Sequence, residues 1–284
     1  MKTKVLIVCT GNTKIGETFD FRLNHSFIYE QTEALKKFNV EFEYFFIRGK
    51  GISGYLKNYR RYLRILKTFK PGIVHAHYGL SGLFANLQRK VPVITTFHGS
   101  DVFLFKFNRR LSRIANLLSV SSIVVNKKMG IILRNMTKIQ VIPSGVDINR
   151  SYPLKISDTL SLRGIEGEKI NILFSSRFDY YEKNYPLAKE VIALLGPAYN
   201  LIELKGYSRE EVNLLMNSCD VALMTSISEG SPMFIKEAMA CNCPVVSTDV
   251  GDVREVFGNT EGCYIASFSP VDVAENVKLA LEFR

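Results

Sequence analysis

The sequence predicts an α/β protein made of two successive domains, each built on a parallel, doubly wound sheet. Short apolar runs alternate with amphipathic segments of helical length along most of the chain, which is the pattern of strands joined by helical crossovers. The alternation stops once, near the middle, and then resumes. With 284 residues and 46% apolar content, the chain is long enough for two small cores.

The first series of segments supplies the first predicted sheet. Its strands are expected at 4–9, 42–47, 73–77, 93–98, 122–125 and 139–142. Its helices are expected between them, at 25–38, 55–69, 81–88, 109–118 and 128–133. Strands separated by helices of this length pair in parallel, with helices on both faces of the sheet.

The second series begins after a Pro/Gly turn at 143–147 and a polar stretch at 152–167. Its strands are expected at 170–175, 200–204, 221–225 and 244–248, and its helices at 185–195, 209–217 and 234–240. We therefore expect an N-terminal domain over residues 1–145 and a C-terminal domain over 146–284, facing each other across a cleft.

Charge is divided unevenly between the two halves. Residues 1–150 contain 25 Lys and Arg against 8 Asp and Glu, a net +17, whereas the remainder contains 12 against 19, a net −7. Such asymmetry points to a nucleic acid, a membrane surface or an anionic substrate beside the first half. No apolar run of about 18 residues occurs and no cleavable leader pattern opens the chain, so a cytoplasmic protein is expected.

Neither a disulfide framework nor a metal site is expected. The five cysteines include no C-x-x-C pair and are interpreted as core thiols. Cys241 and Cys243 have no histidine nearby, and His75 and His77, which alternate on one predicted strand, lack a third ligand.

A turn rich in Gly and Pro follows the strand that ends near Thr225 and leads into the helix at 234–240. This arrangement places the N–H groups of a helix N-terminus at the carboxyl end of a parallel strand, where anionic ligands such as phosphate bind. Glu229 in the turn and Glu237 in the helix are spaced to reach different parts of one ligand, and carboxylates accept hydrogen bonds from vicinal diols. From spacing alone, a helix cap at Glu229 and a solvated Glu237 are equally good interpretations.

Seven residues separate the two glutamates. Glu229 stands within Ser-Glu-Gly-Ser-Pro, and Glu237 opens the run Glu-Ala-Met-Ala-Cys-Asn-Cys-Pro-Val-Val-Ser-Thr-Asp-Val-Gly-Asp-Val. This block resembles the Glu-x7-Glu block of the retaining glycosyltransferases of family 4, which have the twin-Rossmann GT-B architecture. The resemblance extends over nearly the whole chain. It includes 75–79, 96–101, 142–147, 176–178 and Lys183.

The resemblance implies a donor site in the second domain. There Glu237 would bind the ribose hydroxyls, Glu229 would contact the transferred sugar, and Arg177 and Lys183 would clamp the diphosphate. Two cations after the strand at 170–175 also suit a place where leaving-group charge develops, and such a pair can replace a metal ion. The backbone of the intervening segment would lie against the sugar and diphosphate; its residues are Gly230, Ser231, Pro232, Met233 and Phe234.

Three further positions follow from the same resemblance. The turn Lys205, Gly206 and Tyr207 would offer backbone groups to the nucleobase, although a simple turn glycine explains it equally well. His98, which ends the expected strand at 93–98, would touch the donor sugar. The loop at 10–16 is neither a G-x-G-x-x-G nor a P-loop motif. In the resembled family a glycine of this loop approaches the diphosphate, and Gly16 is expected here, with Gly11 as its rival.

Basic and apolar residues are combined in two segments of the first half. Such surfaces suit an anionic bilayer that would carry a lipid-linked acceptor. An ordinary solvated helix face is the alternative, and nucleic acid is not expected because no recognition motif accompanies the charge. The basic residues concerned are Lys57, Arg60, Arg61, Arg64, Lys67, Lys106, Arg109 and Arg110.

The sequence thus predicts transfer of a hexose-type sugar from a nucleotide-sugar donor, with UDP favoured, to a cell-surface glycan or a lipid-linked acceptor. Retention of configuration is implied by the resemblance, the catalytic residues would be His98, Arg177, Lys183 and Glu229, and no cofactor is expected. The segment between Lys183 and Glu229 is shorter than is usual in the family. The chain also stops at Arg284, where members of the family usually continue into a helix that crosses back to the first domain, so the second domain is expected to be abbreviated. A nucleotide-sugar epimerase on the same scaffold and a noncatalytic binding module are the alternatives.

Overall fold

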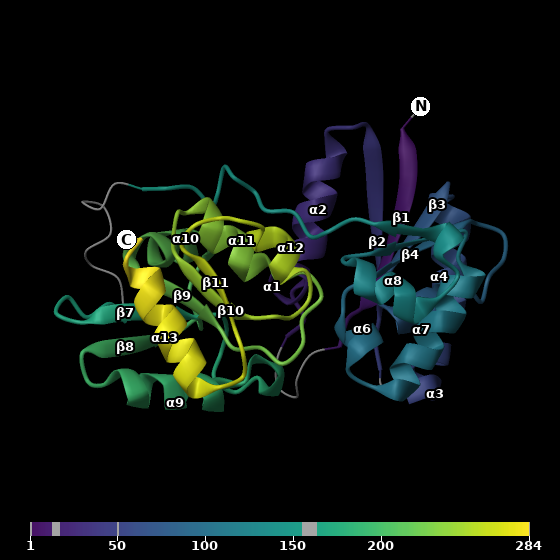
Figure 1. Cartoon of the computed structure of the whole chain (residues 1–284). Helices are drawn as coiled ribbons and strands as arrows, with labels where there is room; N and C mark the ends of the chain where they lie inside the picture. The colour runs from purple at the N-terminus through teal and green to yellow at the C-terminus, as the bar shows by residue number, and fades with distance from the viewer. Residues whose placement is uncertain (1, 13–17, 50, 155–163, 284) are drawn as a thin grey trace. The chain divides into compact units, whose positions relative to one another are not determined.

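The computed structural model describes residues 2–12, 18–49, 51–154 and 164–283 (Figure 1). The chain divides into two compact units, Met1–Ile142 and Pro143–Arg284. Each unit contains one parallel sheet with helices around it, so the predicted fold class is confirmed.

The sheet of the first unit has six strands in the order β2-β1-β3-β4-β5-β6, all parallel. The strands are β1 (Thr3–Thr10), β2 (Val40–Ile47), β3 (Ile73–His77), β4 (Val93–Phe97), β5 (Ser121–Val124) and β6 (Ile139–Val141). β1 lies between β2 and β3 and is buried on both faces from Val5 to Cys9, which explains its continuous apolar run.

Helices cover both faces of this sheet. They are α1 (Phe21–Asn24), α2 (Ser26–Lys36), α3 (Gly51–Lys57), α4 (Tyr59–Phe69), α5 (Gly79–Ala85), α6 (Ser100–Phe103), α7 (Lys106–Leu118) and α8 (Lys127–Leu133). The single helix expected at 55–69 is in fact divided at Asn58. The Asn58 side chain donates to the carbonyl oxygens of Arg48 (2.7 Å) and Gly54 (2.6 Å), so it ties the break to the end of β2.

The sheet of the second unit has five parallel strands in the order β11-β10-β9-β7-β8. They are β7 (Ile170–Phe174), β8 (Tyr199–Glu203), β9 (Val221–Met224), β10 (Val245–Thr248) and β11 (Cys263–Ala266). The four strands predicted here are confirmed within one residue at either end, and β11 is an additional edge strand.

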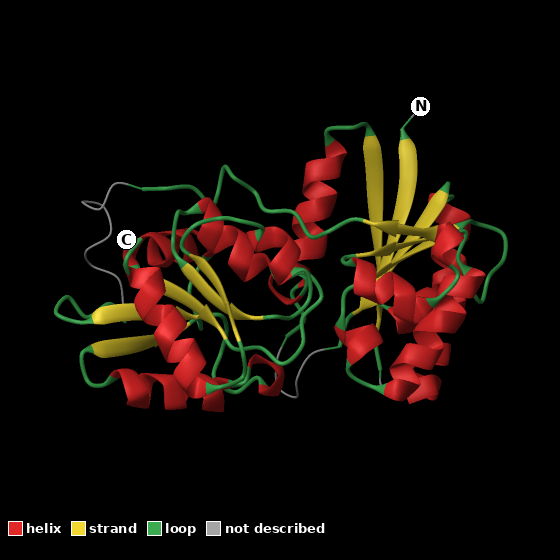
Figure 2. Cartoon of the chain, in the orientation of Figure 1, coloured by secondary structure: helices red, strands yellow, loops and turns green. Residues whose placement is uncertain are grey.

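Two helical layers enclose this second sheet, as the red and yellow elements of Figure 2 show. On one face, α9 (Tyr185–Leu195) and α13 (Pro270–Leu281) pack on Phe174 and Val246. On the other, α10 (Arg209–Ser218), α11 (Met233–Ala240) and α12 (Val253–Phe257) bury an apolar cluster with three cysteines. All five cysteines are free thiols, four buried and Cys263 half-buried, as expected of core thiols.

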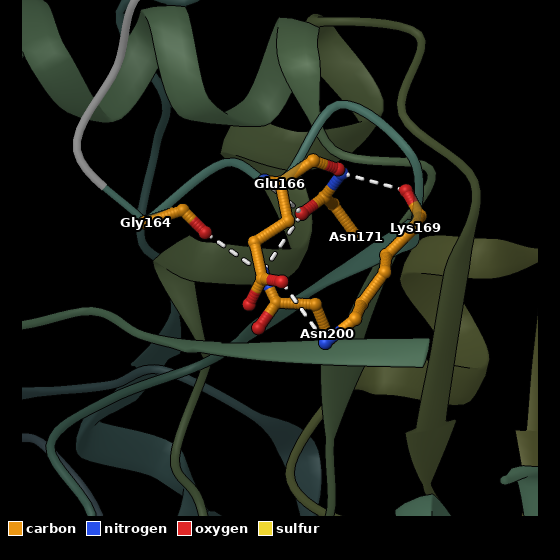
Figure 3. Close-up of polar contacts among 5 residues, drawn as sticks. All are labelled: Gly164, Glu166, Lys169, Asn171 and Asn200. Atoms are coloured by element: carbon orange, nitrogen blue, oxygen red, sulfur yellow. Dashed lines mark hydrogen bonds and ion pairs between the residues drawn. The ribbon is translucent and has the colours of Figure 1, made fainter. Parts of the chain in front are cut away.

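A polar cluster fixes the amino ends of β7 and β8 (Figure 3). The buried Asn171 amide donates to the carbonyl oxygens of Glu166 (3.0 Å) and Lys169 (2.9 Å), and its oxygen accepts from the Glu166 N–H and the Asn200 amide. Asn200 also donates to the Gly164 carbonyl (2.7 Å). The loop before β7 is therefore anchored at one end of the sheet, which leaves the loops at the carboxyl end to form a site.

Candidate functional site

Four loops meet at the carboxyl edge of the second sheet. They follow β7, β8, β9 and β10, and they carry most of the residues that the sequence singled out in the second half; the others lie on α11. Ligands of open parallel sheets bind at this edge because the strand ends leave a crevice there.

Lys183 and Glu229 come from two of these loops and form an ion pair. Lys183 ends a short 3-10 helix, Tyr181–Lys183, and its Nζ lies 2.6 Å from Glu229 Oε1. The Ser226 hydroxyl donates to the same oxygen (2.8 Å), and the Thr225 hydroxyl donates to the Lys183 carbonyl (3.0 Å). The Lys183 side chain is only 25% exposed and that of Glu229 only 16%, so a cation and a carboxylate are held together with little access to water.

Arg177, in the loop after β7, makes a two-point contact with Asp179. Its Nε and Nη2 lie 3.0 and 2.6 Å from the two carboxylate oxygens, and its guanidinium lies 5.4 Å from the centre of the Tyr180 ring. Sequence reasoning missed Asp179. The only sequence feature that points to Asp179 is its place two residues after Arg177. A guanidinium binds carboxylate and phosphate through the same two-point geometry, so a nearby carboxylate is a natural partner.

Glu237 lies on α11 and pairs with Arg209 at the start of α10. The Arg209 Nη1 is 3.0 Å from Glu237 Oε1, and the glutamate is 12% exposed. Ser208 begins α10 with a capping box completed by Glu211, which fixes where Arg209 emerges. Arg209 was not predicted, since 28 residues separate it from its partner.

The turn at 205–207 precedes Arg209. Lys205 and Gly206 are exposed and Tyr207 is half-buried. Gly206 has a φ of +74°, a conformation that favours glycine, so the turn explains this glycine without a ligand.

The segment from Gly230 to Pro232 leads into α11 and is buried. The Phe234 side chain belongs to the apolar core, so only its backbone is available to a ligand. The loop after β10 packs closely on this turn: Gly251 has a φ of +62°, and a Cβ there would lie 2.6 Å from the Gly230 carbonyl oxygen. The shape of the turn is therefore set by contacts from outside its own segment.

In the first unit, His98 directly follows β4 and lies among aromatic rings. Its Nε2 is 3.0 Å from His77 Nδ1, and its ring centre is 4.8 Å from those of Phe27 and Tyr78. Burial lowers the pKa of His98 to about 3 and that of His75 to about 4. Both rings are therefore neutral at pH 7, and His98 can exchange hydrogen bonds with hydroxyl groups without adding a positive charge.

Asp101 organises the loop that carries His98. Its buried carboxylate accepts from the backbone N–H groups of Gly79 (2.9 Å), His98 (3.1 Å) and Gly99 (3.0 Å). Burial raises the Asp101 pKa, and these N–H groups oppose the rise. A pocket of about 220 Å³ lies beside it, within the first unit. The polar residues lining the pocket include Thr10, Tyr55, Tyr78, Ser81 and Asn108.

Gly16, the predicted contact to the diphosphate, lies outside the described residues. Its rival Gly11 is buried, and its N–H donates to the Ile47 carbonyl (2.8 Å). A Cβ on Gly11 would lie 2.8 Å from Phe46 Cβ, so close packing on β2 accounts for this glycine.

Two protein-family models match this chain, one in each half. A model described as Glycosyltransferase Family 4 matches residues 26–150, and one described as Glycosyl transferases group 1 matches residues 181–282. The chain belongs to glycosyltransferase family 4.

Relatives of known sequence agree with this family. TuaC of Bacillus subtilis, a glycosyltransferase named for teichuronic acid biosynthesis, is 24% identical over 75% of this chain, which spans 63% of TuaC. The uncharacterized glycosyltransferase MJ1178 of Methanocaldococcus jannaschii is 25% identical over 80% of this chain and 70% of its own length.

Solved structures confirm the GT-B fold of this family 4 chain. Anabaena HepE, whose structure holds UDP and glucose, matches 99% of this chain and 90% of its own with a TM-score of 0.77 at 17% identity. At 17% identity, this structural similarity to HepE is evidence for the fold alone.

The basic residues of the first unit divide into two groups. Lys57, Arg60, Arg64 and Lys67 are exposed on α3 and α4, as are Lys106 and Arg110 on α7. Arg61 is also exposed, but its guanidinium donates to the Phe46 carbonyl and lies 4.7 Å from the Phe45 ring centre; the half-buried Arg109 donates to the Val102 carbonyl (2.9 Å). Large apolar side chains are exposed beside the first group; they are Leu56, Leu63, Phe105 and Phe107.

Proposed function

We propose that this family 4 glycosyltransferase moves a hexose-type sugar from a nucleotide sugar, with UDP as the expected nucleotide, to a cell-surface glycan or a lipid-linked acceptor. The observation that carries the proposal is the Lys183–Glu229 pair at the carboxyl edge of the second sheet, beside the turn that starts α11. A cation for phosphate and an acceptor for sugar hydroxyls are adjacent there, and the structure of HepE with UDP and glucose supports the same ligand class.

Donor binding would replace two of the ion pairs at this edge, those of Arg177 and Lys183. The diphosphate offers Arg177 and Lys183 stronger partners than Asp179 and Glu229, because phosphate oxygens accept charge-assisted hydrogen bonds from both cations. Once Lys183 turns to the phosphate, Glu229 is released to accept from a sugar hydroxyl. The two cations then stabilise the charge that develops on the departing diphosphate, a task for which no metal ion is required.

The reaction retains the configuration at the anomeric carbon in this proposal. The bond from that carbon to the diphosphate breaks as the acceptor oxygen bonds to the same face, and the acceptor proton passes to an oxygen of the leaving phosphate. Glu229 and neutral His98 position the sugar through hydrogen bonds, and Glu237 anchors the ribose. None of these residues needs to form a covalent bond to the sugar.

An anionic membrane surface is the proposed location of the acceptor. Residues 1–150 carry a net +17, and exposed basic side chains alternate with Leu56 and Leu63 on α3 and α4. Basic and apolar groups together suit the headgroup region of a bilayer. Within the described residues no helix is long and apolar enough to cross a membrane. The basic and apolar side chains of α3 and α4 are the basis on which we propose a peripheral location, at the cytoplasmic face of a membrane.

A thermal-shift screen with UDP, GDP and ADP followed by turnover assays tests this function. A nucleotide at 100 times its Kd stabilises the folded chain by about 2.7 kcal/mol, which is a clear rise in Tm. We expect UDP to give that rise and a UDP-sugar to be consumed only with an acceptor. Free sugar released without an acceptor would indicate an epimerase, and binding without consumption would indicate a noncatalytic module; either result contradicts the proposal.

A further inference from the structure

Lys236 precedes Glu237 on α11, and the function proposed above makes no use of it. Its side chain is 11% exposed, and its ammonium lies near three acceptors from three segments. These are the Ser144 carbonyl oxygen (2.7 Å), Ser231 Oγ (2.5 Å) and Asp252 Oδ2 (3.2 Å). An ammonium has three N–H donors, so all of them are used.

The Ser231 hydroxyl is the second centre of this network. It donates to Asp252 Oδ2 (2.6 Å) and accepts from the Ser144 N–H (3.1 Å) and from Lys236. Both backbone groups of Ser144 are therefore bound, one by Ser231 and one by Lys236. The network joins the first residues of the second unit, the turn before α11 and the loop after β10.

A buried ion pair is weak evidence for a role in stability. Removing two charges from water has a large cost, and well-packed apolar residues hold a helix on a sheet at least as well. Asp252 even retains one buried oxygen, Oδ1, that has no hydrogen-bond partner among the residues described. Apolar substitutes, however, could bind neither the Ser144 carbonyl nor the Ser231 hydroxyl.

We propose that Lys236 and Asp252 are positioning residues, which hold the turn from Glu229 to Pro232 in the geometry that binds the donor. The inference rests on the proposed function. Ser231 is two residues from Glu229, and Lys236 is adjacent to Glu237, so loss of the network would displace both proposed sugar contacts. A displacement of about 1 Å in a ligand-positioning group can cost about a hundredfold in rate.

The test compares K236M, the double variant K236M/D252N and the control K278M. K236M leaves the Asp252 carboxylate buried without its cation, so it lowers Tm. The double variant also removes that charge and recovers part of the loss. Lys278 is exposed on α13, away from the network, so K278M controls for the loss of one lysine. A structural role predicts that donor affinity follows Tm across these variants, whereas a positioning role predicts that it does not.

Two measurements separate the outcomes. Hydrogen–deuterium exchange of 143–147 and 228–233 should be about tenfold faster in both Lys236 variants than in the wild type and K278M. The Kd for UDP should rise about tenfold or more in both, including the double variant that recovers Tm. Wild-type exchange and wild-type affinity in the double variant would overturn the inference. A wild-type protein that binds no UDP refutes the proposed donor instead, and the exchange measurement still decides whether the network holds the turn.

Discussion

The Lys183 ammonium lies 2.6 Å from Glu229 Oε1, so a proposed phosphate-binding residue and a proposed sugar-binding residue form an ion pair with each other. Arg177 and Asp179 also form an ion pair, 2.6 Å apart at their nearest atoms. Both cations of the proposed clamp, Arg177 and Lys183, are thus in ion pairs with carboxylates of the same sheet edge. Exchange of these partners for a diphosphate is the chemical event on which the proposed function depends.

Glu229→Gln distinguishes the binding of the diphosphate by Lys183 from the binding of the sugar by Glu229. The variant weakens the hold of residue 229 on Lys183 but leaves the cation in place, so the Kd for UDP should not rise. The amide cannot accept from a sugar hydroxyl as a carboxylate does, and turnover of the UDP-sugar should fall by about tenfold or more. Calorimetry with UDP and steady-state kinetics measure the two quantities. A rise in the UDP Kd that matches the loss of turnover would contradict the assigned role.

Arg177→Ala removes half of the clamp and should lower kcat by about a hundredfold or more, since its charge is proposed to act on the departing diphosphate. Asp179→Asn is the matched control, because it removes the internal competitor while retaining the arginine. As the Arg177–Asp179 pair is partly exposed, UDP should bind up to about fivefold more tightly to D179N. Unchanged turnover in R177A would refute the role of the arginine.

Acid should destabilise the first unit through its buried histidines. The unfolded chain protonates histidine below about pH 6.5, whereas folded His98 stays neutral down to about pH 3. Stability is therefore complete above pH 6.5 and falls as the pH drops toward 3, by on the order of 3 kcal/mol for His98 at pH 4. Chemical denaturation at pH 7 and pH 4 should show a smaller acid loss in His98→Asn than in the wild type. Equal losses would mean that His98 titrates normally.

Membrane contact should depend on where the basic residues lie. R60Q/R64Q removes two exposed charges from α4, and K127Q/K128Q removes two from α8 as the control. Each charge near an anionic surface is worth about 1 kcal/mol, so the first variant should bind vesicles of 30% phosphatidylserine about thirtyfold more weakly. The control should lose much less. Equal losses would indicate a nonspecific response to net charge.

The sequence predicted the central elements of both sheets because parallel strands buried on two faces form apolar runs, as β1 and β9 do. The edge strand β11 escaped prediction: three of its four residues are only half-buried, which weakens the pattern. The break between α3 and α4 escaped it too, because the contacts of Asn58 with Arg48 and Gly54 are tertiary and leave no periodic signal.

In the candidate site, too, the residues with a local sequence pattern were predicted and the tertiary contacts were not. Spacing and resemblance brought out Arg177, Lys183, Glu229 and Glu237, which stand within recognisable segments. None of their ion-pair partners was predicted, although Lys183 and Glu229 had each been singled out as a ligand-binding residue. Arg209 reaches Glu237 from another helix, and Asp252 reaches Lys236 across 16 residues. Such pairings are decided by how the loops pack at the sheet edge, which the sequence alone does not specify.

The most direct test of the clamp is a calorimetric comparison of UDP with UMP on the wild type, R177A and K183M. If the two cations bind the diphosphate, the wild type should prefer UDP over UMP by about tenfold or more, and each variant should lose most of that preference while its UMP affinity stays the same. Equal binding of UDP and UMP to the wild type, or a preference that survives both substitutions, would contradict the proposed site.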